Sequence, residues 1–291
     1  MSAPLLTLAM AWRIAFATAA APVFGAVLLL AIKRLTGAAW EGVGAPARFA
    51  PALAPAGALL GLAQLAVPAP DHLAGWMAPW SVALRGVAIG ALLAFSAWRL
   101  RNGVSTTAAG VTLALVAFAI TPVADDWLLG GAPGHPVSAI GMMLAVEAIG
   151  AAAAVSLAVG RTTPRTRADM GKLGVTAAIG LAYLAFMDYL ITWYGNLPER
   201  VGFYVARAEP AGVALCWAAL VVGLAGPIAI LSLRTSEARH GQAGLAMLAG
   251  LLLFNGWWIG GGLLALLLAT VVLAGFGVAA YHWGSREAAY G

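Results

Sequence analysis

The chain is dominated by apolar runs that are close to the length a helix needs to cross a bilayer. About 20 consecutive apolar residues are required to span the hydrocarbon core. With 62% hydrophobic and 9% charged residues, against about 25% charged residues in soluble domains, the composition predicts an all-α, polytopic integral membrane protein. Residues 1–291 are expected to form a single transmembrane domain with about nine spans. The predicted spans are 11–33, 49–67, 80–99, 106–124, 137–160, 173–194, 211–233, 241–258 and 261–283.

The basic residues outside these runs predict an orientation. Even-numbered connections hold only Arg200 and Arg207. The odd-numbered connections and the tail hold the others: Lys33, Arg34, Arg48, Arg99, Arg101, Arg161, Arg165, Arg167, Lys172, Arg234, Arg239 and Arg286. The positive-inside rule therefore places odd connections and the C-terminus in the cytoplasm and the N-terminus outside. Because these charges form no patch, the net charge of +5 gives no footprint for nucleic acid.

Several ionisable residues lie inside the predicted spans. Asp188 and Arg85 are both expected a short way below the outer boundary, where burial of a charge is costly and a functional role is the default hypothesis. An Arg85–Asp188 pair would relieve both costs, and such a pair, or snorkelling to the interface, is also a purely structural explanation. Asp125 and Asp126 follow Pro122, where the fourth span is expected to end. We expect Asp125 in a solvated turn, whereas Asp126 is close enough in sequence to a helix end to approach Arg85.

Glu147 stands within the fifth predicted span, flanked by apolar and small residues. A carboxyl group there must be protonated, paired or facing a wet cavity. Two interpretations stay open: a step in a proton path, or a neutral carboxylic acid between packed helices.

The sequence excludes several kinds of centre. Cys216 is the only cysteine, which rules out internal disulfides, thiolate iron–sulfur ligation and covalent haem attachment. The four histidines, His72, His135, His240 and His282, all lie at predicted span edges, so they offer neither axial haem ligands within the spans nor the spacing of a metal site. No nucleotide-binding or hydrolase motif is present. We therefore expect no metal and no catalytic machinery within the chain.

The sixth span ends in Asn196-Leu197-Pro198-Glu199. Asn196 is predicted to be a helix N-cap, with Pro198 in the first turn and Glu199 at the third helical position, as in a capping box. Apolar residues then follow at helical spacing, which predicts a short amphipathic helix over 197–208 in the outer interface.

These residues also carry a family resemblance. The segment 182–207 resembles the most characteristic segment of the F subunit of alternative complex III, the bacterial quinol oxidoreductase that replaces the cytochrome bc1 complex. Further similarity lies, in the same order, in Leu35-Thr36-Gly37 with Trp40, in the helix around Arg85, in 126–141 and in Asp169, Gly171 and Lys172. The resemblance covers roughly residues 5–258. The family's histidines are absent at the positions of Lys33, Arg34 and Gly134, and Glu147 has no family counterpart.

The resemblance implies two four-helix bundles plus an extra helix, related to polysulfide-reductase-type subunits, in the bacterial inner membrane. It implies no haem or iron–sulfur cluster in this chain, a possible quinone or quinol ligand, and partners that include haem c and iron–sulfur subunits at the outer face, besides lipid. A quinone headgroup needs a few placed polar groups in an apolar cleft. We expect Arg85, Asp126 and Asp188 to form the polar core of such a pocket, with Trp127, Tyr189 and Trp193 as its walls.

Two other classes of function remain open. A purely structural subunit would use the polar residues to hold helices in register, so a closed Arg–Asp pair favours it and a cavity that reaches Asp188 argues against it. A small proton channel or secondary transporter would show inverted repeats and helices broken at the midplane. The clearest predicted break is at the surface, which ranks this class last.

Overall fold

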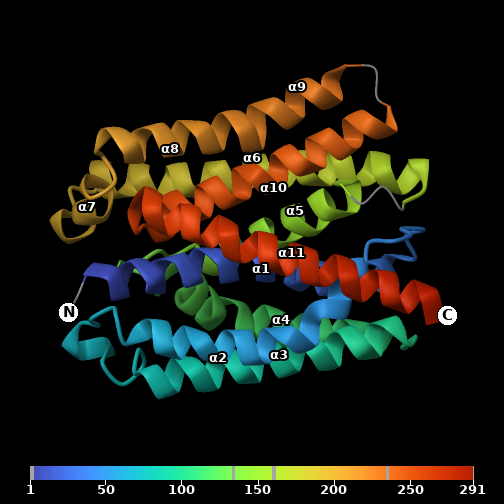
Figure 1. Ribbon diagram of the computed structural model, residues 1–291, viewed down its shortest axis with the longest axis horizontal. Coiled ribbons are helices and arrows are strands. Elements are labelled where there is room, and N and C mark those ends of the chain that lie inside the picture. The colour runs from blue at the N-terminus through green and yellow to red at the C-terminus, as the bar shows by residue number, and fades with distance from the viewer. Residues whose placement is uncertain (1–2, 133–134, 159–161, 234–235, 291) are drawn as a thin grey trace.

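Helices make up most of the chain that the structure describes, and that part of the chain contains no strand. The computed structural model describes residues 3–132, 135–158, 162–233 and 236–290, and the side chains of residues 199 and 279–290 lie outside the description. Most helices run roughly along one common axis (Figure 1). They are α1 (Ala3–Thr36), η1 (Ala45–Ala52), α2 (Leu53–Gln64), η2 (Asp71–Leu73), α3 (Pro79–Arg101), α4 (Thr106–Ala124), η3 (Asp125–Leu129), α5 (Ile140–Ala158), α6 (Pro164–Tyr194), α7 (Pro198–Val205), α8 (Pro210–Leu220), η4 (Val221–Ala225), α9 (Gly226–Ser232), α10 (Glu237–Ile259) and α11 (Gly262–Tyr290).

Within those described ranges, seven helices are long and apolar enough to cross a membrane. They are α1, α3, α4 with η3, α5, α6, α8 to α9 through η4, and α10. The prediction of a helical membrane protein is thus confirmed, and seven of the nine predicted spans have a long helix. The predicted span 261–283 corresponds to α11, whose apolar described part is the shorter Gly262–Val278.

The predicted span 49–67 is a composite of two helix types. The 3₁₀ helix η1, which contains Pro46 and Pro51, leads into the 12-residue α2. Proline removes backbone donors, which weakens a regular α-helix at this point. Because a 3₁₀ helix rises about 2.0 Å per residue and an α-helix about 1.5 Å, η1 and α2 together extend roughly 34 Å. The composite therefore has the length of a span although α2 alone does not.

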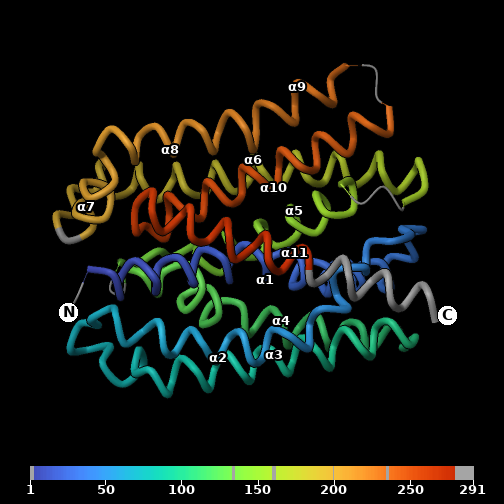
Figure 2. The backbone as a smooth tube through the Cα atoms, viewed as in Figure 1, coloured from blue at the N-terminus to red at the C-terminus, as the bar shows by residue number. Residues whose placement is uncertain are grey.

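The helix α1 lies between two groups of helices (Figure 2). On one side it packs against η1, α2, α3 and α4, and on the other against α5, α10 and α11. Its residues from Ala9 to Ala31 are mostly buried, while α8 has no buried residue. The first group is called the α2–α3 side below, and the group of α5, α6, α8 and α10 is called the cavity side.

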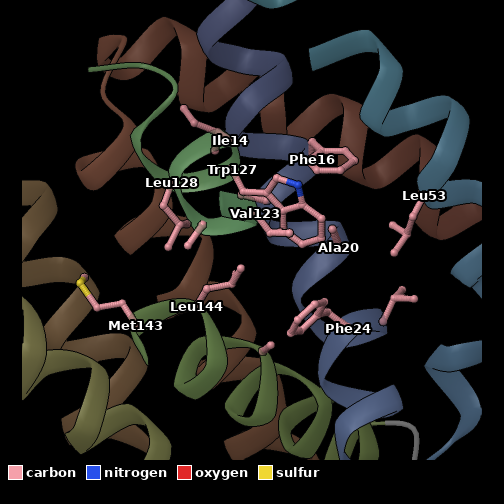
Figure 3. Close-up of a cluster of buried hydrophobic side chains, with 14 of the residues drawn as sticks. Ile14, Phe16, Ala20, Phe24, Leu53, Val123, Trp127, Leu128, Met143 and Leu144 are labelled. Carbon is pink, nitrogen blue, oxygen red and sulfur yellow. The ribbon is translucent and has the colours of Figure 1, made fainter. Parts of the chain in front are cut away.

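The sequence predicted that the fourth span ends near Pro122, but the helix continues past this residue. The helix continues from α4 into one π-helical turn, η3, which carries Asp125 and Asp126. A π-helical turn within an α-helix often marks a functional position. It also turns Trp127 into the core, where the indole meets Phe16 and Phe24 edge-on at ring-centroid distances of 5.0 and 5.9 Å (Figure 3). Trp127 is therefore a core residue and not the pocket wall that the sequence predicted.

The corner after α6 has a different cap from the predicted one. Asn196 has φ of 45°, and Leu197, whose side chain makes no capping bond, is the N-cap of α7. The Leu197 N–H donates to the Thr192 carbonyl at 3.3 Å, and the Asn196 N–H donates to the Trp193 carbonyl at 3.3 Å. This is the Schellman pattern, in which Asn is tolerated at the left-handed position. Asn196 as an N-cap was wrong, Pro198 in the first turn is confirmed, and the Glu199 side chain lies outside the description.

Candidate functional site

The first cluster of buried polar residues joins α3 to η3 and is called the arginine–aspartate cluster. Arg85 donates from Nε to Oδ2 of Asp126 and from a terminal nitrogen to Oδ1, both at 2.7 Å. Its guanidinium also donates to the Ser81 hydroxyl oxygen at 2.7 Å and lies 4.0 Å from the centroid of the Trp76 ring. This two-bond geometry is the strongest form of ion pair. The expected approach of Asp126 to Arg85 is confirmed, and the alternative pair of Arg85 with Asp188 was wrong.

Arg13 of α1 completes this cluster. It is fully buried and donates to the backbone carbonyl of Asp126 at 3.1 Å and to the side-chain oxygen of Gln64. Gln64 in turn donates to the Val67 carbonyl at 3.1 Å. Arg13 was not among the predicted site residues, although an arginine inside an apolar run is itself a signal that a buried partner exists. The cluster ties α1, α2, α3 and η3 together, with Asp126 bonded through both carboxylate oxygens.

The second cluster, called the Asp188 cluster, lies where α6, α7 and the segment before α5 meet. Tyr204 donates its hydroxyl to Oδ2 of Asp188 at 2.5 Å, and Nε2 of His135 lies 3.3 Å from the same oxygen. The His135 ring stacks on Phe203 at a centroid distance of 4.0 Å. All three polar side chains are buried. Asp188 thus contacts two titratable side chains through one oxygen, whereas Asp126 is paired with an arginine through both of its oxygens.

His135 is a site residue that the sequence analysis set aside as a residue of a span edge. A signal existed: the positive-inside rule already placed His135 on the same side of the membrane as the end of the span that holds Asp188.

Two residues of the α7 corner carry shifted acid–base properties. Burial raises the pKa of Tyr204, and its bond to Asp188 together with that carboxylate's charge raises it further. Burial lowers the pKa of Arg207 to about 10, which leaves it a cation at neutral pH. Arg207 donates to the carbonyls of Trp257 and Trp258 at 2.9 and 2.6 Å, so it satisfies the C-terminal end of α10, where a positive charge is stabilising.

A cavity of about 780 Å³ lies among α5, α6, α8 and α10. Its volume falls within the range of about 300–1,000 Å³ that is typical of small-molecule sites. On α6 its lining extends from Gly174 to Trp193, which is about 28 Å of helix at the usual rise. The polar lining side chains are few: Glu147, Tyr189, Trp193, Tyr204, Arg207, Cys216, Trp217 and Trp257. The shape and the lining suit a long, mostly apolar molecule.

The cavity is open between α6 and α8. Lining residues from both helices are exposed: Phe186, Tyr189 and Trp193 on α6, and Val213 and Trp217 on α8. At the other end α6 packs against η4 and α9. There Gly223 and Gly250 cross so closely that a Cβ on Gly250 would lie 2.0 Å from the Gly223 Cα. Both glycines line the cavity, so this close crossing lies in its wall, toward the end remote from α7.

The predicted site residues therefore divide between different places. Tyr189 and Trp193 line the cavity, and Tyr204 connects its wall to Asp188, which is not itself a lining residue. Arg85 and Asp126 belong to the separate arginine–aspartate cluster. A single pocket with Arg85, Asp126 and Asp188 as its core was wrong in this respect, because each carboxylate has its own partners.

Glu147 also lines the cavity, at the face where α5 meets α1 and α10. Its Oε1 accepts from the Asn255 amide at 3.0 Å, and the same nitrogen lies 3.2 Å from the Thr18 hydroxyl. Thus the cavity carries two groups that can exchange a proton: the Asp188 cluster behind Tyr204 at the α7 end, and Glu147 in its wall.

Comparison with known proteins adds no family to these observations. No family model matches the chain, and no curated protein matches its sequence.

Proposed function

We propose that the chain is a cofactor-free membrane subunit of an alternative complex III-like quinol oxidoreductase, and that it binds a quinone or quinol in the cavity among α5, α6, α8 and α10. In this role it is an accessory subunit of a respiratory electron-transfer assembly in a bacterial inner membrane. The observation that carries the proposal is the cavity itself: an elongated apolar space, open between α6 and α8, with proton-exchanging groups at one end.

The two ends of the cavity suit the two parts of an isoprenoid quinone. The end remote from α7 is lined by small and apolar residues of α6, η4 and α10, such as Gly174, Leu224 and Met247. These residues suit a hydrocarbon tail. The α7 end carries Tyr189 and Tyr204 in edge-to-face contact at 5.1 Å. Aromatic walls with a few polar groups are typical of sites for planar ligands.

The Asp188 cluster supplies the chemistry that a quinol needs besides electron transfer. Oxidation of a quinol releases protons as well as electrons, and the electrons would leave to haem c or iron–sulfur subunits. Tyr204 is placed between the cavity and Asp188, so its hydroxyl can pass a proton toward that carboxylate while His135 orients it. A relay of this kind works through groups within hydrogen-bond reach.

The proposal also includes a sidedness. The basic residues favour an outer location for α7 and the connection before α5, which places the Asp188 cluster at the outer side. Protons released there would leave on the outer side, where the haem c and iron–sulfur partners are expected to dock.

The test is purification of the native assembly from membranes, followed by identification of its subunits and extraction of its quinone. We expect haem c and iron–sulfur subunits to accompany the chain, and quinone to be lost when Ala182→Phe narrows the cavity. Ala88→Phe is the matched control, because Ala88 is exposed on α3 and does not line the cavity. A chain that purifies alone, or quinone content that the two variants change equally, would contradict the proposal.

A purely structural role is a second candidate, and the arginine–aspartate cluster favours it. That cluster is closed, joins three helices and η3, and contains no member that lines the cavity. In this case Asp188→Asn would leave quinol oxidation by the assembly unchanged.

A further inference from the structure

We infer that Glu147, Asn255 and Thr18 form a proton-binding site in the wall of the cavity, at which the Glu147 carboxyl group releases and takes up a proton through the cavity. This group of residues is called the carboxyl site. The inference deepens the proposed function and rests on it in one respect, the apolar ligand that occupies the same space.

The carboxyl site is built by three helices that come from distant parts of the chain. Thr18 lies on α1, Glu147 on α5 and Asn255 on α10, and the Asn255 amide contacts both other side chains. Glu147 is 3% exposed and Asn255 is 0% exposed. The three helices pack directly against one another, so the positions of these polar atoms are fixed by the core.

Two oxygens of the carboxyl site have no partner among the described residues. They are Oε2 of Glu147 and Oδ1 of Asn255, both completely buried. Buried polar atoms are nearly always satisfied, and an exception calls for an explanation such as a catalytic role or a bound species. Because Glu147 lines the cavity, a change of its side-chain torsion would bring its free oxygen to a polar group that enters there.

The charges around Glu147 do not compensate an ionised carboxylate. On α1, Arg13 is bonded to Gln64 and Asp126; on α6, Asp188 is bonded to Tyr204. The titratable groups that share the cavity wall are Tyr189, Tyr204, Arg207 and Cys216. The titratable groups on the other faces or ends of the elements packed against α5 are Lys33, Arg34, Arg48, Asp125, Arg165, Arg167, Asp169, Lys172, Tyr183, Tyr194, Glu237, Arg239 and His240.

None of these groups hydrogen-bonds Glu147 in the part of the chain that the structure describes, where its hydrogen-bond partner is the neutral amide of Asn255. An isolated ionised carboxylate in an apolar environment is very costly. The neutral carboxylic acid is therefore the resting form that this environment accommodates. When water enters the cavity beside it, the proton passes from the carboxyl oxygen to that water and on to the bulk solvent, the remaining carboxylate is hydrated, and no electrons move.

A hydrophobic carbodiimide tests the inference directly. Its central carbon is attacked by the carboxyl oxygen while the carboxyl proton moves to a carbodiimide nitrogen, so the reaction needs a protonated carboxyl that apolar reagents can reach. Dicyclohexylcarbodiimide is applied to the protein in membranes, and the peptides are analysed by mass spectrometry. We expect an adduct on Glu147, its loss in Glu147→Gln, and less adduct as the pH is raised through the titration of the group.

Two further measurements separate the carboxyl site from alternatives. Ala182→Phe and an added short-tailed quinone should both reduce the adduct, whereas Ala88→Phe should not. The exposed Glu209 is the internal control, since a water-soluble carbodiimide should modify it and leave Glu147 unmodified. Protection of Glu147 from the carbodiimide by sodium ions would overturn the inference, because the side-chain oxygens of Thr18, Glu147 and Asn255 would then form a cation site.

The outcome is distinguishable from that of the proposed function. Adduct on Glu147 without quinone in the purified assembly would contradict the quinone proposal alone. Quinone in the assembly with no adduct on Glu147 at any pH would contradict the proton-binding site alone.

Discussion

Two carboxylates of this molecule are buried to the same extent and are treated in opposite ways. Asp126, on the α2–α3 side, is 3% exposed and makes two bonds to Arg85, beside a second arginine at its backbone. Glu147, on the cavity side, is also 3% exposed and has one bond, from a neutral amide. A carboxylate that is paired with an arginine holds its two helices together, whereas a carboxyl group with few hydrogen bonds beside a cavity can change its protonation state.

The same difference extends to the helices around each carboxylate. On the α2–α3 side, α2 and α3 approach so closely that Gly57 and Gly86 are in backbone contact. On the cavity side close approaches also occur, between Gly223 and Gly250 and between Gly244 and Ala154, but a cavity of about 780 Å³ lies among the same helices. The four predictions below test this contrast.

The largest effect is expected from Asp126→Asn. The substitution keeps the shape but leaves Arg85 without its counter-charge, and breaking a buried pair costs about 3–5 kcal/mol. We expect the low end of this range, because the Arg85 side chain is 18% exposed. The measurement is the free energy of unfolding in detergent micelles.

The matched control for this change is Asp125→Asn on the neighbouring, half-buried residue. The double variant Asp126→Asn/Arg85→Met should recover much of the loss, because it removes the unpaired charge as well. If the two single aspartate variants lowered the free energy of unfolding equally, the Arg85–Asp126 pair would not be what stabilises this side of the protein.

The next largest effect is expected from Tyr204→Phe. A hydrogen bond to a charged group contributes about 1.5–3 kcal/mol, and this substitution removes the bond to Asp188 while retaining the ring. Because the pKa of Tyr204 is raised in the folded protein, the stability that it contributes is fully present below its unfolded pKa of about 10. That contribution is lost as the pH rises through the higher folded value.

The stability difference between wild type and Tyr204→Phe should therefore be constant near neutral pH and decrease in strongly alkaline solution. Unfolding in detergent across this pH range is the measurement. Tyr183→Phe, on an exposed tyrosine of α6, is the control and should show no such dependence. A difference that grows with pH would contradict the bond to Asp188.

The fold was more predictable from the sequence than the site was. Runs of apolar residues locate helices by themselves, because the cost of unpaired backbone groups in hydrocarbon leaves few alternatives. Helix type was less predictable: the π turn after Pro122 and the 3₁₀ helix with Pro46 and Pro51 depend on how neighbours compensate missing donors. The ionisable residues were identified in part, because charge in an apolar run is conspicuous.

Their partners were not predictable in the same way. Arg85 was correctly expected near Asp126, which lies at the end of a neighbouring helix. Asp188 contacts His135 and Tyr204, which are 53 and 16 residues away in the sequence. Glu147 contacts Asn255, which is 108 residues away. Such pairings depend on how the helices pack, which the local sequence around each residue does not reveal.

A smaller effect is expected at the corner between α6 and α7. Asn196 adopts φ of 45°, a left-handed conformation that costs most L-residues about 1–2 kcal/mol. Asn196→Ala should therefore destabilise the protein by about 1 kcal/mol, while Asn196→Gly should be neutral or slightly stabilising. If both variants behaved alike in detergent unfolding, the Schellman corner would not be the reason for asparagine here.

The smallest effect on stability is expected from Glu147→Gln, which tests the opening contrast directly. Glutamine retains a side-chain oxygen that can accept from Asn255, and a neutral acid replaced by a neutral amide leaves no charge unpaired. The cost should stay below the about 1 kcal/mol that one hydrogen bond contributes, far less than for Asp126→Asn. If Glu147 were instead ionised and paired with a cation, the same substitution would leave that cation without its counter-charge. The loss in the free energy of unfolding would then be as large as for Asp126→Asn. The two unfolding free energies, measured side by side, therefore decide whether the cavity side holds a proton or a salt bridge.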